Sequence, residues 1–331
     1  MNRSQLLRAS AVLALYAVPV IALAPQERAK RYFVAMAIQG DAPAPGAKPG
    51  SFRREMLARG YVEGRNLVLD VRGVGGDNSK FPSLVRELLA LKPDVLVAET
   101  TPGALAAKQA TSTVPIVMWN VSDPIGTGLV TSLAHPGGNV TGSADAGIEI
   151  GLKSIELLLT VVPRARTIAV LMSDNPVHPI QLHAIESAAT PYELRVLPFH
   201  VLSENQAEGV FNDMVAQRVD AFISLGGAPL GSTDRQDKLF AILAAKAAIP
   251  GVYASRGPEG SGKLMSYGMK TGVGGKLTAT YVADILDGGH PADMPVQRPR
   301  EVELFINMKT AASLGLIVPP ALVLQADYVQ Y

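Results

Sequence analysis

Along the chain from residue 31 onward, short apolar runs rich in β-branched residues alternate with stretches in which apolar residues recur every three or four positions. The first pattern is typical of a buried strand and the second of an amphipathic helix. In the first half, strands are predicted at 32–38, 67–71, 95–97, 116–119 and 140–142, and helices at 52–59, 81–91 and 104–110. Strands that alternate with helices in this way predict a parallel sheet covered by helices.

A second series of the same kind follows the helix predicted at 151–161, which ends at Pro163. Its strands are predicted at 167–172, 195–199, 221–225 and 251–254, and its helices at 178–189, 206–218 and 234–247. A strand at 263–269, a helix at 275–286 and a strand at 303–307 come after it. The additional helix is best explained if the chain returns there to the first lobe, so that several segments join the lobes.

The predicted fold class is therefore α/β, with two doubly wound parallel-sheet lobes and a multi-strand hinge. The first lobe is expected to comprise residues 31–148 plus 270–303, and the second lobe residues 149–269 plus 304–331. The length of 331 residues agrees with two core-forming units at roughly 150 residues each.

The first 30 residues differ from the rest of the chain in their composition. Arg3 and Arg8 precede the uncharged run 9–24, which closes on Ala22-Leu23-Ala24, the layout of a secretory signal peptide. The run is shorter than the roughly 20 apolar residues of a membrane span, and Pro19 interrupts it. We expect residues 1–30 to be a signal peptide or an N-terminal anchor, and the mature protein to be periplasmic or otherwise extracytoplasmic.

Charge and composition narrow the range of functions. The chain has 30 Lys and Arg residues and 29 Asp and Glu residues, which leaves a formal net charge of +1. This charge creates no broad positive electrostatic potential that would attract nucleic acid. The absence of cysteine removes disulfides, thiolate metal sites and cysteine nucleophiles. The five histidines lack the i,i+3 or i,i+4 spacing of helical metal ligands, so no metal is expected.

Catalytic and nucleotide-binding motifs are incomplete. The segment GPEGSGK at 257–263 has the spacing of a phosphate-binding loop, but Leu264 stands where Ser or Thr is needed and a strand is predicted next. We therefore expect a Gly-rich turn between two strands there. No G-x-S-x-G motif is present, and we predict neither a catalytic residue nor a cofactor.

Small polar residues gather at the predicted carboxyl ends of the strands, where open α/β sheets bind their ligands. These segments are 37–40, 99–103, 120–124, 173–176, 226–229 and 253–256. They suit a small polar molecule held by many neutral hydrogen bonds. Thr100 or Thr101 is predicted to be the N-cap of a helix with Pro102 at its first position, and the free amides there are suited to a carboxylate.

The chain resembles the substrate-binding proteins of ABC importers that adopt the type I periplasmic-binding-protein fold, in the branch that includes tryptophan/tyrosine-type binders. The resemblance rests on several segments in the family's order: GYVEGRN at 60–66, TPGALA at 101–106, VPIV at 114–117, SDPIG at 122–126, HPGGNVTG at 135–142, LMSYG at 264–268, INMKTA at 306–311, LGL at 314–316 and PP at 319–320. It implies a monomeric receptor that binds a small solute between its lobes and delivers it to the transmembrane subunits of a permease, without catalysis.

The resemblance also implies which residues face the ligand. If the ligand is an amino acid, Asp123 would bind its ammonium group and the amides after Thr101 its carboxylate. With the strand-end residues, the predicted ligand-binding set is Gln39, Thr100, Thr101, Pro102, Ser122, Asp123, Asn175, Gly226, Gly227, Tyr253, Arg256 and Tyr267.

Two segments depart from the family. The loop 39–51 is rich in Ala, Pro and Gly where the family has a Ser/Gly-rich loop, and an aromatic residue common in relatives is replaced by Gly257-Pro258 beside Arg256. An amino acid, aromatic or not, or a small carboxylate remains the expected ligand. The alternatives are an extracellular ligand-sensing module of a signalling system and, with less support, a secreted α/β enzyme.

Overall fold

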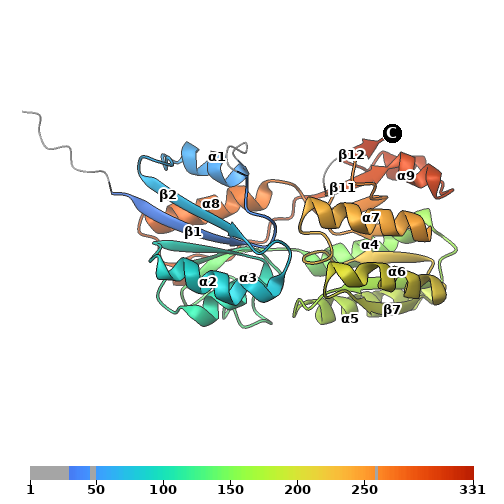
Figure 1. Cartoon of the computed structure of the whole chain (residues 1–331), viewed down its shortest axis with the longest axis horizontal. Coiled ribbons are helices and arrows are strands. Elements are labelled where there is room, and N and C mark those ends of the chain that lie inside the picture. Colours follow the sequence, from blue (N-terminus) through green and yellow to red (C-terminus); the bar gives the residue numbers. More distant parts are fainter. Residues whose placement is uncertain (1–29, 45–49, 258–259) are drawn as a thin grey trace, which may run out of the picture. The chain divides into compact units, whose positions relative to one another are not determined.

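The computed structural model describes residues 30–44, 50–257 and 260–331. The predicted signal segment therefore lies, except for Lys30, outside the described residues. Two sheets organise the described chain, with five strands in one and seven in the other. Figure 1 shows both sheets with their covering helices.

The first sheet is parallel and has the strand order β2-β1-β3-β4-β5. Its strands are β1 (Tyr32–Ile38), β2 (Leu67–Gly73), β3 (Val95–Glu99), β4 (Ile116–Val121) and β5 (Val140–Ala144). Successive side chains of a strand point to opposite faces. Accordingly Ala35 and Ala37 pack with α2 (Phe81–Ala90) and α3 (Thr100–Ala110), whereas Val34 and Met36 pack with α1 (Ser51–Ala58) and α8 (Val273–Leu286).

The second sheet has the order β12-β11-β10-β9-β8-β6-β7. Its strands are β6 (Thr167–Met172), β7 (Arg195–His200), β8 (Ala221–Ser224), β9 (Gly251–Tyr253), β10 (Met265–Met269), β11 (Val302–Asn307) and β12 (Tyr328–Gln330). One face is covered by α4 (Gly147–Val161), α5 (His178–Ala189), α9 (Met308–Ser313) and α10 (Pro320–Val323), and the other by α6 (Ala207–Ala216) and α7 (Asp234–Ala247). Only the β10–β11 pair is antiparallel among the described strands of this sheet.

The chain passes between the two sheets after β5, after β10 and before β11. Helix α4 follows β5 but packs on the second sheet, and α8 follows β10 but packs on the first. A parallel bridge between Ser143 and Gln297 lies beside these crossings. The two α/β lobes predicted from the sequence are thus confirmed. The strand predicted at 303–307 is β11, which pairs antiparallel with β10, and the short β12 is an addition.

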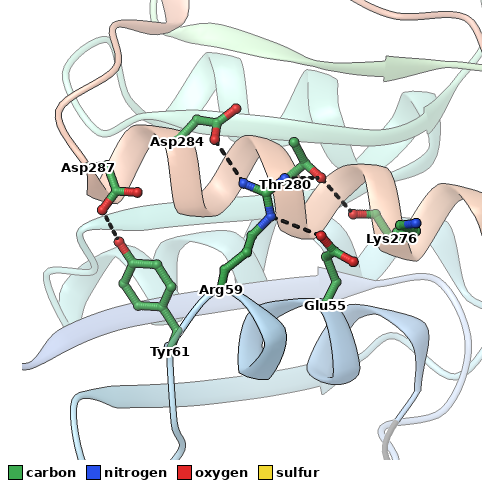
Figure 2. A network of polar contacts seen from close by, with 7 residues as sticks. All are labelled: Glu55, Arg59, Tyr61, Lys276, Thr280, Asp284 and Asp287. Atoms are coloured by element: carbon green, nitrogen blue, oxygen red, sulfur yellow. Dashed lines mark hydrogen bonds and ion pairs between the residues drawn. The ribbon is translucent and has the colours of Figure 1, made fainter.

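Polar contacts fix α8 against α1, although 225 residues separate Arg59 from Asp284. Figure 2 shows the guanidinium of Arg59 reaching Glu55, Thr280 and Asp284 at 2.9, 3.1 and 3.1 Å. The hydroxyl of Tyr61 donates to Asp287 at 2.6 Å, and burial together with this carboxylate raises the pKa of Tyr61. These bonds hold the returning helix in place, so the crossing segments are anchored to the first lobe.

No helix among the described residues combines the length and apolar character needed to cross a membrane.

Candidate functional site

A cavity of about 360 Å³ lies at the carboxyl ends of the strands. This volume is within the range of small-molecule sites, roughly 300–1,000 Å³. The first lobe lines the cavity with Gln39, Gly40, Glu99, Thr100, Thr101, Asn120, Ser122 and Asp145. The second lobe lines it with Gly147, Ile150, Gly151, Ser154, Asn175, His178, Gln181, Ile223, Ser224, Leu225, Gly226, Gly227, Gly231, Ser232, Ala254, Ser255 and Met269. Both lobes therefore contribute to one binding space.

Asp145 follows β5 and is the carboxyl nearest to the crossing into the second lobe. The hydroxyl of Ser122 donates to its carboxylate at 2.7 Å, and the backbone N–H of Gly147 donates to Oδ1 at 3.0 Å. Burial raises the pKa of the Asp145 carboxyl, while these hydrogen bonds and the charge of Arg298 act in the opposite direction. The bonds fix the orientation of this carboxyl on the cavity wall.

The start of α3 forms the next part of the wall, and its cap differs from the sequence prediction. Glu99 is the N-cap residue and Thr100 already belongs to the helix, with a φ of 62°. Thr101 does not cap the helix, because its hydroxyl accepts from the N–H of Ser122 at 3.1 Å and lies 3.2 Å from the Ser122 carbonyl. The prediction of a Thr N-cap with Pro102 at the first helical position is therefore wrong.

The carboxyl of Glu99 also faces the cavity. The backbone N–H of Gln39 donates to its Oε2 at 2.7 Å, which ties the end of β3 to the loop after β1. Burial raises the pKa of Glu99, and the hydrogen bond from Gln39 lowers it. The first lobe thus brings two carboxyl groups to the cavity.

The second lobe presents neutral polar groups from α5 and β8. The backbone N–H of Ser173 donates to Nδ1 of His178 at 2.8 Å, and burial lowers the pKa of His178 to about 4. His178 is therefore neutral at pH 7, and its proton is on Nε2. Gln181, one helical turn later, is 4% exposed, and its Oε1 has no hydrogen-bond partner among the described residues; the same holds for Oγ of Ser224. A bound molecule would satisfy these atoms.

Seven of the residues predicted from the sequence line the cavity: Gln39, Thr100, Thr101, Ser122, Asn175, Gly226 and Gly227. They come from loops after five different strands, which the fold brings together. These strand-end residues thus share one cavity, and their contact with a ligand stays a prediction.

The other five do not line it, and each has another environment. Pro102 is half-buried in α3, and Asp123 accepts from the N–H of Gly126 at 2.9 Å within its own turn. Tyr253 is buried in the core and packs edge-on against Phe222. Arg256 lies over the ring of Tyr328, 4.2 Å from its centroid, and Tyr267 packs against the core beneath α4.

Lys263, the last residue of the phosphate-loop-like segment, is a buried structural lysine. Its Nζ lies 2.5 Å from Oδ1 of Asp237 and donates to the carbonyl of Ser255 at 3.0 Å. Burial lowers the pKa of Lys263 and raises that of Asp237. The ion pair thereby joins two loops that carry the cavity residues Ser232 and Ser255.

Sequence reasoning missed Asp145, His178 and Gln181. Asp145 directly follows β5, but the strand was predicted to end at Gly142, so this carboxyl was not assigned to a strand end. His178 was weighed as a metal ligand against a surface or core histidine, and not as a residue of the cavity. The position of His178 at the start of a helix after β6 was the signal that could have identified it.

Comparisons with known proteins agree on the family. A family model described as "ABC transporter substrate binding protein" matches residues 34–330. A tyrosine-binding protein of Clostridioides difficile (strain R20291) is 28% identical over 286 residues, which cover 86% of this chain and 79% of the relative. The solved ABC domain of Streptococcus pneumoniae in complex with L-Trp has a TM-score of 0.82 at 25% identity, covering 91% of this chain and 100% of that one. A conserved domain protein of Vibrio cholerae gives a TM-score of 0.80 at 27% identity, with the same coverage.

Proposed function

Because this chain belongs to the family of ABC transporter substrate-binding proteins, we propose that it binds an α-amino acid in the cavity described above. The names of two relatives, a tyrosine-binding protein and a protein in complex with L-Trp, support an amino acid as the class of ligand. The protein then delivers its ligand to an ABC permease, without a catalytic step. It acts as a monomer and has no nucleic-acid partner, in keeping with its net charge of +1.

The observation that carries the proposal is that Asp145 and the buried Gln181, whose Oε1 has no partner among the described residues, both line the cavity beside Gly147. A Cβ atom at Gly147 would clash with Nε2 of Gln181 and would lie 3.2 Å from Oδ1 of Asp145. The glycine therefore lets the buried Gln181 amide approach this carboxyl. An ammonium group bound here would donate to Asp145 and to the free Oε1 of Gln181, and a hydrogen bond to a carboxylate is about twice as strong as a neutral one.

The α-carboxylate of the ligand lies at the start of α3 in this proposal. The first N–H groups of a helix have no partner within the helix, and they favour an anion. Thr100 and Thr101 line the cavity at this point, beside Ser122. The helix start and Asp145 together match the opposite charges of an amino acid.

Export to the extracytoplasmic side completes the proposal. Its support is the basic start and the uncharged run of residues 9–24, which lie outside the described residues.

The test is isothermal titration calorimetry with the 20 amino acids, on protein freed of ligand by unfolding and refolding. We expect at least one to bind, and Asp145→Asn to weaken its binding by about 2 kcal/mol or more, roughly 30-fold in Kd. Asp123→Asn is the matched control, since that carboxyl lies outside the cavity. Absence of binding by every amino acid, or a larger effect of D123N than of D145N, would contradict the proposal.

A further inference from the structure

We propose that the bound amino acid carries a second positive charge on its side chain, and that Glu99 binds this group. The inference rests on the proposed function and names the class of ligand, a basic amino acid. It assigns Glu99 as the residue that determines specificity.

The charges on the cavity wall are all of one sign. Glu99 and Asp145 are acidic, and neither lysine nor arginine lines the cavity among the described residues. His178 is neutral because Nδ1 accepts a backbone hydrogen bond in a buried position. With both carboxyls ionised the wall carries two negative charges, and a zwitterion with a neutral side chain brings no net positive charge to balance them.

The carboxyl of Glu99 has no cation of its own. Within the described residues, its one hydrogen bond comes from the N–H of Gln39, and it forms no ion pair. The side-chain amide of Gln39 is engaged elsewhere, because its Nε2 donates to Oδ1 of Asn78 at 2.9 Å. An ionised carboxylate removed from water without a counter-charge is unfavourable, and a cationic group of the ligand would remove this penalty.

A second, independent sign of a ligand comes from buried polar atoms on the opposite wall. Gln181 and Ser224 are 4% and 2% exposed, and each has a side-chain oxygen without a partner among the described residues. Both residues line the same cavity as Glu99. The cavity is therefore built for a molecule that contacts both lobes.

The two carboxyls lie at the ends of strands that are not neighbours in the sheet. Glu99 ends β3 and Asp145 follows β5, with β4 between these strands in the sheet. The sheet therefore places the two carboxyls at different strand ends on one cavity wall, so that two cationic groups of one ligand can contact them separately.

The apolar part of the wall favours a methylene chain over a ring. Its apolar side chains are Ile150, Ile223, Leu225, Ala254 and Met269. Phenylalanine, tyrosine and tryptophan are absent from the described lining, so no aromatic side chain is available to stack on an indole or a phenol.

The experiment uses calorimetry with pairs of ligands of nearly equal shape and different charge. L-arginine is compared with L-citrulline and L-lysine with L-norleucine, on refolded ligand-free protein. We expect the charged member of at least one pair to bind about 10- to 100-fold more tightly than its neutral partner. Equal or tighter binding of the neutral members, or a preference for L-tryptophan over both basic amino acids, would overturn the assignment.

Glu99→Gln provides the decisive variant, because its amide oxygen still accepts the N–H of Gln39 and the fold is preserved. We expect E99Q to reduce the preference for L-arginine over L-citrulline to about twofold or less. Glu87→Gln, an exposed carboxyl paired with Arg72 away from the cavity, should leave the preference unchanged. If a neutral amino acid binds and E99Q has no effect, this inference fails and the proposed function stands; if no amino acid binds, both fail.

Discussion

Glu99 and Asp145 are carboxyls that the folded chain holds at the cavity with raised pKa values, and burial is the larger cause for each. In the ligand-free protein, the protonated form of each carboxyl stabilises the folded state relative to the unfolded state. This stabilisation is lost as the pH rises through the raised pKa. A cation bound at either carboxyl lowers its pKa again. Binding of a basic amino acid therefore releases protons.

The affinity for L-arginine should consequently depend on pH. As the pH falls below the raised pKa of a carboxyl, we expect Kd to rise about tenfold per pH unit for each carboxyl that must ionise on binding. The other charged groups near Asp145 are Arg298 and Glu149, and His178 stays neutral because its pKa is about 4. Calorimetry between pH 5 and 8, in two buffers of different ionisation enthalpy, measures the protons released; a constant Kd with no proton release would contradict the account.

At the level of single residues, the small and polar positions after the strands were easier to identify from the sequence than the acidic side chains of the cavity wall. Asn175 and Gly226, which line the cavity, were selected because small and polar residues after strands are visible in the sequence. Asp145 was missed because β5 runs two residues beyond the glycine at which it was predicted to end. The unpartnered amide of Gln181 depends on the close approach of α4 and α5 at Gly147, which no local pattern encodes.

At the level of elements, α5 and α7 have the bounds that the hydrophobic pattern predicted. Helix α3 begins at Thr100, before both the range 104–110 given by the apolar pattern and the predicted first position Pro102, and Thr101 bonds to Ser122 instead of capping the helix. Strand β12 was not predicted, since its three residues owe their conformation to pairing with β11. Local periodicity thus predicts helix interiors, and tertiary contacts decide the ends.

The loops around β9 and α7 depend on the ion pair between Lys263 and Asp237. Lys263→Met leaves a buried carboxyl without its cation, so we expect a loss of about 3–5 kcal/mol in the free energy of unfolding. The double variant K263M/D237L removes both charges and should recover most of this loss. Urea unfolding measures all three proteins; a single variant within about 0.5 kcal/mol of the wild type would refute the role of the pair.

At the level of the whole molecule, the alternation of strands and helices predicted two α/β lobes, and the position of the last long helix predicted the return of the chain to the first lobe. The boundaries 31–148 plus 270–303 and 149–269 plus 304–331 remain predictions. The side chains that face each other across the cavity are brought together by three crossings of the chain, and this arrangement is beyond local sequence patterns.

The most direct test of the account is a crystal structure of the protein grown with L-arginine. The account predicts the amino acid in the cavity, with its α-ammonium group about 2.8 Å from the carboxylate of Asp145 and its guanidinium bonded to Glu99. An arginine molecule bound outside this cavity, or bound within it with neither cationic group on these two carboxyls, would contradict it.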